Sequence, residues 1–241
     1  MAPKKKHSAK KTPHIKPLHP HPEAKATPAI HPLHPTQMDF FDTLTLCKKY
    51  HIPTLPTVRV KDETQLGIAL EQFGFPVAMK AIGKKLIHKS DVGGVKLNVM
   101  NNHYALEVFD HFKKIPHMES VAVQPMKKGL EIIIGGKRDP QFGPMVLVGL
   151  GGVYTEVFKD TAMRVCPITR LDAHAMLEEL KIYPILMGAR GQKPINMRQL
   201  EETLLNVSQF MLKNEQIKEL DLNPVMATHA EVVAVDVRAI L

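Results

Sequence analysis

Apolar residues recur every three to four positions in some segments of this chain and every second position in others, which predicts a mixture of helices and strands. Helices are expected from Thr36 to near Pro53, from Asp62 to Gly74, from Asn101 or Asn102 through Phe112, over Leu171–Leu180 and over Asn196–Lys213. The first repeats Met38, Phe41, Leu44 and Cys47, and the second buries Leu66, Ile68, Ala69 and Phe73. The last carries a stripe of Met197, Leu200, Leu204, Val207 and Met211, which we assign to the core.

Strands are expected where β-branched and apolar residues cluster between turn signals. They cover Thr57–Val60, Pro76–Ile82, Val95–Val99, Glu119–Gln124, Leu130–Gly135, Met145–Leu150, Val153–Phe158, Ile217–Asn223 and Glu231–Val237. The last two are expected to form a hairpin around Thr228-His229. The pattern predicts an α+β fold of two lobes, residues 36–125 and 126–241, with a cleft at the hinge near Gln124-Pro-Met126.

Residues 1–35 differ from the rest of the chain in composition. Seven of the chain's lysines lie there against one acid, so this tail carries +6 of the net charge of +8. Folded residues with a net charge of only +2 do not support nucleic-acid binding by a basic face. The tail repeats Pro-Leu-His-Pro at Pro17–Pro20 and Pro32–Pro35, which favours an extended arm, although its histidines are also potential transition-metal ligands.

The bulk composition is that of a soluble globular protein, with 44% hydrophobic and 23% charged residues among 241. No apolar run approaches the ~20 residues of a membrane span, and no apolar segment follows the first lysines as in a signal peptide. Cys47 and Cys166 are the only cysteines and show no metal-binding spacing. These features favour a reducing cytoplasm.

The loop between the predicted strands Pro76–Ile82 and Val95–Val99 is rich in cations and glycine. Lys84, Lys85, His88 and Lys89 lie in it, and Gly93-Gly94 close it. Such a loop can lay ammonium groups and backbone amides along a polyphosphate, and its histidine could carry a phosphoryl group. The segment is not a P-loop, because His88 replaces the second glycine and a strand rather than a helix follows.

A second group of polar residues lies near the C-terminus. In the predicted strand, Asp221 and Asn223 share one face about 7 Å apart, and Asp236 is expected on the partner strand. Carboxylate and amide oxygens suit a hard cation such as Mg²⁺. Together with the lysine loop they predict a site for a magnesium-bound nucleotide. The glycine-rich segment Gly149–Gly152 is either part of this site or only a tight hairpin.

From about Gln37 to the C-terminus, the chain matches the motifs of a known family in the same order. The matching positions are Val77-Ala-Met-Lys80, His88–Val95, Gly129-x-Glu131, Asp139-x-x-Phe142-Gly-Pro144, Gly149-x-Gly-Gly152, Glu156, Asp160, Arg164, Pro167, Gly188-x-Arg-Gly191 and Asp221-x-Asn-Pro224. The chain resembles the β subunit of ADP-forming acyl-CoA synthetases, and is similar to an ATP-grasp domain related to the β subunit of succinyl-CoA synthetase.

The resemblance implies an ATP-grasp fold with ADP or ATP between the lobes, and conversion of acyl-CoA, ADP and phosphate to a carboxylic acid, CoA and ATP. It implies His88 as a phosphoryl carrier, Asp221 facing an incoming phosphohistidine, and Asn223 and Asp236 as Mg²⁺ ligands. The implied nucleotide-binding residues are Lys80, Lys89, Val123, Gln124, Met126, Glu131, Gly151, Gly152 and Arg164. A CoA-binding α subunit, in an α2β2 heterotetramer, is the implied partner.

The chain departs from that family in one position, because Asn196 stands where related sequences usually have an aspartate. It also has no G-x-G-x-x-G fingerprint, so we do not expect this chain to bind CoA. Two other functions fit the same residues. A free-standing ATP-grasp carboxylate ligase would be active without a partner, and a nucleotide-sensing scaffold would depend on residues 1–35.

Overall fold

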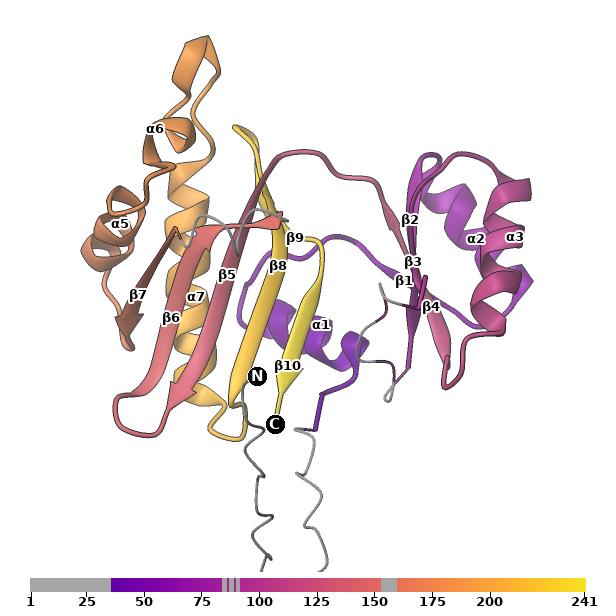
Figure 1. Cartoon of the computed structure of the whole chain (residues 1–241), viewed down its shortest axis with the longest axis horizontal. Coiled ribbons are helices and arrows are strands. Elements are labelled where there is room, and N and C mark those ends of the chain that lie inside the picture. The colour runs from indigo at the N-terminus through magenta and orange to yellow at the C-terminus, as the bar shows by residue number, and fades with distance from the viewer. Residues whose placement is uncertain (1–35, 84–85, 87–88, 90–91, 153–159) are drawn as a thin grey trace, which may run out of the picture. The chain divides into compact units, whose positions relative to one another are not determined.

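Two antiparallel sheets, each with its own buried apolar cluster, organise the described part of the chain (Figure 1). The computed structural model describes residues 36–83, 86, 89, 92–152 and 160–241. Residues 35–241 form one compact unit. Within the described ranges, none of the helices combines the length and apolarity needed to cross a bilayer. The predicted α+β class is confirmed.

The smaller sheet has four strands in the order β1-β4-β2-β3. They are β1 (Val58–Val60), β2 (Val77–Ile82), β3 (Val95–Val99) and β4 (Ser120–Pro125). Helices α2 (Glu63–Phe73) and α3 (Asn102–Lys113) share its apolar cluster. Every residue of β2 is buried, since this strand lies between β3 and β4. The single charged residue of β2, Lys80, is therefore held in a largely apolar environment.

Local sequence explains where α2 begins and ends. The Asp62 carboxylate accepts a hydrogen bond from the Gln65 amide at 2.8 Å, which confirms the predicted N-cap. Gly74 ends the helix with a φ of 65°, a conformation that favours glycine. Ile68, which we expected on the buried face, is 58% exposed, because Leu66, Ala69 and Leu70 form that face instead.

The larger sheet runs β10-β8-β5-β6-β7, with β9 paired to β8. Its strands are β5 (Leu130–Asp139), β6 (Gly143–Leu150), β7 (Thr161–Val165), β8 (Glu219–Ala227), β9 (Val232–Ala234) and β10 (Val237–Ile240). Helices α1 (Phe40–Lys49) and α7 (Met197–Lys213) lie behind these strands in Figure 1 and share their apolar cluster. The predicted stripe of α7 is part of this cluster, as expected.

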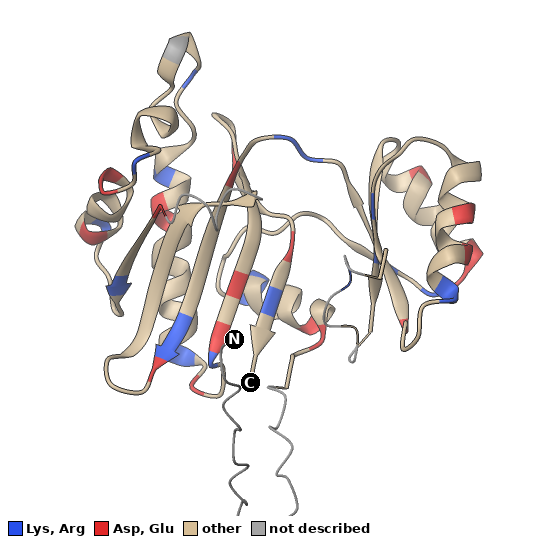
Figure 2. Cartoon of the chain, viewed as in Figure 1, with Lys and Arg blue, Asp and Glu red and all other residues tan. Residues whose placement is uncertain are grey.

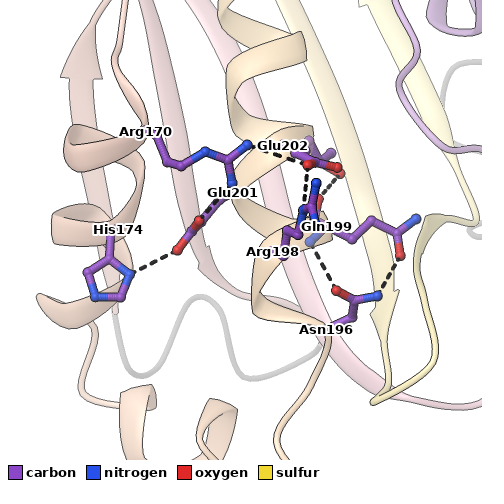
Figure 3. Close-up of polar contacts among 8 residues, drawn as sticks. Arg170, His174, Asn196, Arg198, Gln199, Glu201 and Glu202 are labelled. Carbon is purple, nitrogen blue, oxygen red and sulfur yellow. Dashed lines mark hydrogen bonds and ion pairs between the residues drawn. The ribbon is translucent and has the colours of Figure 1, made fainter.

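Helix α5 (Arg170–Glu178) contacts α7 and β7, and the short helices α6 (Tyr183–Leu186) and η2 (Ala189–Gly191) follow it. A polar network joins α5 to α7 (Figure 3). Arg170 forms ion pairs with Glu201 and Glu202 at 3.2 and 3.4 Å. The His174 ring nitrogen Nδ1 lies 2.9 Å from Glu201, whose carboxylate raises the pKa of the imidazole. Charged groups therefore hold the outer faces of the two helices together.

Asn196 caps α7 (Figure 3). It also ties the helix to the turn that follows β8. Its side-chain oxygen accepts a hydrogen bond from the Gln199 amide at 3.1 Å. Its side-chain nitrogen donates to the Ala230 carbonyl at 3.2 Å. An aspartate could cap the helix equally well but could not donate to Ala230. The departure from the family pattern at this position therefore has a structural role.

Several predicted boundaries differ from the structure because tertiary pairing overrides local pattern. Strand β5 continues to Asp139 rather than ending at Gly135, since it pairs with β6 over that length. Helix α1 begins at Phe40 rather than near Thr36, because the Asp39 carboxylate caps it. Gln37 instead forms a bridge to Ile240 at the edge of β10. Strand β8 continues to Ala227, whereas we expected it to end at Asn223. The proline that follows is tolerated because the β5–β8 register shifts between Ile132 and Ile134.

Two expected strands and one unexpected strand remain to be compared with the structure. The predicted strand Glu231–Val237 is wrong as a single element, since it breaks into β9 and β10 around Val235 and Asp236. Strand β7 was not predicted, although its sequence alternates exposed and buried positions. The predicted strand Val153–Phe158 lies outside the described residues.

Candidate functional site

Two lysines converge on Asp236, which lies in the interruption between β9 and β10. The Lys89 ammonium group is 3.1 Å from one carboxylate oxygen of Asp236 and 3.2 Å from the other. The Lys80 ammonium group is 3.8 Å from the same carboxylate. We call Lys80, Lys89 and Asp236 the charge cluster. It joins β2 of the smaller sheet to the C-terminal strands of the larger one.

Lys80 is the most deeply buried member of the charge cluster, with 4% of its surface exposed. Burial lowers the pKa of its ammonium group, Asp236 opposes this effect, and Lys89 adds to it. A cation at this depth requires an anion or several acceptors nearby. The carboxylate of Asp236 supplies that anion here, and phosphate oxygens could supply it equally well.

The interruption between β9 and β10 also leaves the Val235 carbonyl free of the strand ladder, and side chains of the smaller sheet bond to it. Lys80 donates to this carbonyl at 2.8 Å and the Gln124 side-chain nitrogen at 3.2 Å. The same Gln124 nitrogen donates to the Thr57 hydroxyl at 2.8 Å. The Gln124 side-chain oxygen is buried without a partner among the described residues. An acceptor left in this state is available to a ligand donor.

Asp221 and Asn223 lie on one face of β8, as predicted, while Leu220 and Leu222 point into the core. Burial raises the pKa of Asp221 to about 6, with a further contribution from the neighbouring Glu219. One carboxylate oxygen of Asp221 is buried and has no hydrogen-bond partner within the described part of the chain. This face of β8 therefore presents a carboxyl group that holds a proton more readily than usual.

The residues proposed as Mg²⁺ ligands are Asn223 and Asp236. Among the described residues, no group of three or more His, Cys, Asp or Glu side chains could hold a metal ion by itself. Magnesium commonly takes only one or two protein ligands and completes its shell with water and substrate phosphates. The side-chain oxygens of Asn223 and Asp236 therefore fit a cation that arrives with a nucleotide.

The glycine-rich segment after β6 lies directly against β5. The Gly151 amide donates to the Glu131 carbonyl at 2.9 Å. Gly152 has a φ of 73°, and a Cβ atom there would lie 2.1 Å from the Glu131 carboxylate. Close backbone approach therefore requires glycine at both positions. The segment positions the exposed side chain of Glu131 at the start of β5.

Replacing Gly151 by alanine should lower the free energy of unfolding by about 1–3 kcal/mol. The added Cβ would lie 2.7 Å from the Ile132 carbonyl carbon and 2.9 Å from its nitrogen, and these backbone atoms cannot move independently. Gly67→Ala is the matched control, because nothing lies within 4 Å of its Cβ in α2, and it should stabilise by roughly 0.5–1 kcal/mol. Urea unfolding of both variants tests this. Equal stability of the two would contradict it.

The structure does not bring all predicted site residues together. Arg164 lies on β7, at the opposite edge of the larger sheet from β10, and pairs with both oxygens of Glu179. The Val123 side chain is fully buried in the apolar cluster of the smaller sheet. Met126 is partly buried, and its amide donates to the Pro76 carbonyl at 3.1 Å. His88 lies outside the described residues, as do Lys84 and Lys85.

Sequence reasoning missed three participants in this region: the Val235 carbonyl, Thr57 and Arg238. The first two act through the Gln124 and Lys80 contacts and have no signature in the sequence. Arg238 lies directly across from Asp221 in the β8–β10 register. The Asp-x-Arg pattern at residues 236–238 is a usable signal, but a single strand over Glu231–Val237 does not include Arg238 and so gives no register with Asp221.

Comparison with known proteins identifies the family. A family model for the ATP-grasp domain matches residues 34–241. The β subunit of ADP-forming acetate–CoA ligase I from Pyrococcus furiosus is 41% identical over 205 residues, covering 81% of this chain and 88% of that subunit. The ADP-forming acetate–CoA ligase I of Archaeoglobus fulgidus is 40% identical, but this chain spans only 30% of its length.

Solved structures agree with the sequence relatives. The dinucleotide-forming acetyl-coenzyme A synthetase 1 of Candidatus Korarchaeum cryptofilum, in complex with coenzyme A, Ca-AMPCP and HgCl⁺, superposes with a TM-score of 0.80 at 35% identity, covering 86% of this chain and 93% of that one. A second structure of that protein, with coenzyme A and Mg-AMPPCP, has a phosphohistidine segment pointing towards the nucleotide-binding site; its TM-score is 0.76 at 34% identity, with the same coverage. The chain belongs to the ATP-grasp family, among relatives that include the β subunits of ADP-forming acetate–CoA ligases.

Proposed function

We propose that this chain is the nucleotide-binding subunit of an ADP-forming acyl-CoA synthetase and transfers a phosphoryl group between phosphohistidine and ADP. The observation that carries the proposal is the charge cluster, in which two lysines from the smaller sheet and its following loop converge on Asp236. Lysines held by a single carboxylate can exchange it for the oxygens of a diphosphate. The family relationship supports the same chemistry.

In this proposal Lys80 and Lys89 bind the nucleotide phosphates and neutralise charge during transfer. The buried oxygen of Gln124 accepts a hydrogen bond from the base, and the backbone at Val123 and Met126 lines the base pocket. Glu131, positioned by Gly151 and Gly152, lies near the ribose. Arg164 keeps its contact with Glu179 and supports the fold rather than the phosphates. Asn223 and Asp236 would hold Mg²⁺, which supplies further charge neutralisation when bound.

The transfer itself breaks the phosphorus–nitrogen bond of a phosphohistidine and forms a phosphorus–oxygen bond to the β-phosphate of ADP. Asp221 faces the imidazole that leaves. His88 carries the phosphoryl group between a CoA-binding α subunit and ADP, and the complex is an α2β2 heterotetramer. The reaction takes place in the cytoplasm, in keeping with the buried free thiols of Cys47 and Cys166.

The proposal predicts that ADP with Mg²⁺ binds the full chain and that His88→Asn abolishes phosphorylation of this chain. Asparagine preserves hydrogen bonding but cannot carry a phosphoryl group. Calorimetry of ADP with and without Mg²⁺ tests binding. Mass spectrometry of the complex with its α subunit, under conditions that preserve phosphohistidine, tests the carrier.

Control experiments separate the proposal from its rivals. His103→Asn, on an exposed side chain of α3, should leave phosphorylation and ATP formation unchanged. Turnover by the purified chain without any partner would instead indicate a free-standing ATP-grasp carboxylate ligase. Loss of nucleotide binding on deletion of residues 1–35 would favour a sensing module. No heat from ADP and Mg²⁺ in the assembled complex would refute the proposal.

A further inference from the structure

Asp221 and Arg238 are direct partners across the antiparallel strands β8 and β10. Figure 2 shows acidic positions of β8 beside a basic position of β10. Side chains opposite one another in such a pair share a face, with Cβ atoms roughly 5 Å apart. Yet an oxygen of Asp221 and the Nε atom of Arg238 are both buried without a hydrogen-bond partner among the described residues.

This arrangement is energetically costly as it stands. A buried donor or acceptor without a partner costs about 1–3 kcal/mol, and native proteins contain few of them. Here a donor and an acceptor lie side by side, and neither satisfies the other. A simple anion would suit Arg238 but be repelled by Asp221, and a simple cation would do the reverse. The ligand that satisfies both presents an acceptor to the guanidinium group and a donor to the carboxylate.

There is room for the ring of such a ligand on the β5 side of Asp221, whereas Arg238 lies on its β10 side and does not line this space. A hollow of about 140 Å³ lies on the sheet face opposite α7 and is lined by Asp221, Ile133, Leu147 and Gly135 among others. That volume equals roughly four to five water molecules at liquid density. Gly135 is the partner of Asp221 on β5 and contributes no side chain, which keeps this side open. The apolar wall formed by Ile133 and Leu147 suits a ring more than an isolated ion.

We infer that Arg238 is a catalytic residue that binds the phosphoryl oxygens of the phosphohistidine, while Asp221 accepts a hydrogen bond from the N–H of the same imidazole. This inference rests on the proposed function and adds a residue to it. The phosphorus–nitrogen bond breaks, its electron pair stays on the ring, and the phosphoryl group passes to ADP. The second ring nitrogen keeps its proton, so the leaving group is neutral imidazole. Arg238 stabilises the negative charge of the group in transfer.

Phosphoimidazole, a small analogue of phosphohistidine, allows a test on the full chain. Calorimetry would measure its affinity, and its use with ADP and Mg²⁺ would measure ATP formation. Arg238→Ala should weaken phosphoimidazole binding and lower kcat/KM for it about 100-fold. The dissociation constant of ADP with Mg²⁺ should change less than about threefold. Arg238→Lys, which keeps the charge but not the forked donors, should recover about one tenth of the activity.

The matched control is Arg198→Ala, which removes an exposed guanidinium group from α7, outside the hollow. It should leave both measurements within about threefold of the wild type. Inorganic phosphate, which lacks a ring N–H, should bind the wild type at least roughly tenfold more weakly than phosphoimidazole. Equal affinity for inorganic phosphate and phosphoimidazole would overturn the inference that Arg238 and Asp221 bind the ligand together.

The remaining outcomes separate this inference from the proposed function. A wild-type chain that neither binds ADP with Mg²⁺ nor forms ATP refutes the proposed function, and this inference with it. A wild-type chain that is active while Arg238→Ala retains its activity refutes the role of Arg238 alone. Equal losses in Arg238→Ala and Arg198→Ala also overturn it, because general electrostatics would then explain both. Thermal unfolding identifies a misfolded Arg238→Ala chain, and Arg238→Lys then decides the question.

Discussion

Asp236→Asn should destabilise the chain by about 2 kcal/mol, whereas Lys80→Met should leave its stability within about 1 kcal/mol of the wild type. The two substitutions break the same ion pair, but Asp236→Asn leaves a buried charge behind and Lys80→Met does not. Without Asp236, the Lys80 ammonium group stays buried, and none of the ion pairs among the described residues gives it another carboxylate. Without the Lys80 amine, the Val235 carbonyl still accepts a hydrogen bond from Gln124.

Both substitutions should weaken binding of ADP with Mg²⁺ by roughly 10- to 100-fold, the value of one or two charge-assisted contacts. Urea unfolding and calorimetry on the same samples measure the two effects. Arg59→Met is a suitable control, since its ion pair with Asp39 is half-exposed and separate from the charge cluster. If the two variants lost the same stability, the hypothesis that Asp236 stabilises the buried charge of Lys80 would be wrong.

Asp221→Asn should stabilise the nucleotide-free chain at pH 8 by up to about 3 kcal/mol and should lower phosphoryl transfer by more than about 100-fold. Burial raises the pKa of Asp221 from its usual value of 3.8 to about 6 in the folded chain. The folded state therefore binds a proton that the unfolded state has lost between these two pH values. The contribution of this group to stability is largest at low pH, falls as pH rises from about 4 to about 6, and is fully lost above that range.

Asparagine does not ionise, so the stability of Asp221→Asn should not fall over this pH range. The difference between variant and wild type should be small at pH 4 and reach its full size above pH 6.5 or so. Urea midpoints measured between these limits give the curve. Glu219→Gln is the control on the same strand and should reduce the difference only partly, because Glu219 is the second contributor after burial. A variant no more stable than the wild type at pH 8 would contradict the argument.

Much of the local structure could be predicted from the sequence, because the relevant signals are local. The Asp62 cap and the Gly74 stop of α2, the apolar stripe of α7 and the shared face of Asp221 and Asn223 all depend on neighbours within a few residues. The predictions failed where distant segments compete with local pattern. Gln37 pairs with Ile240 instead of starting α1, and β5 accommodates Pro224 within β8 through a shift of register.

The candidate site shows the same division. The residue types were visible in the sequence: lysines in and after β2, and carboxylate and amide oxygens near the C-terminus. The contacts were not visible, because Lys89 and Asp236 are 147 positions apart and meet only when the strand ladder breaks at Val235. Arg238 became part of the site only through its register with Asp221.

By itself, the sequence determined the α+β class, the limits of most elements and the chemistry available to the site, since periodicity, caps and residue type act over short distances. Only the tertiary structure decided which charges meet, which polar atoms are left without partners and which face of the larger sheet stays open. Those outcomes depend on strand register and burial, and these are set by the packing of the whole chain rather than by any one segment.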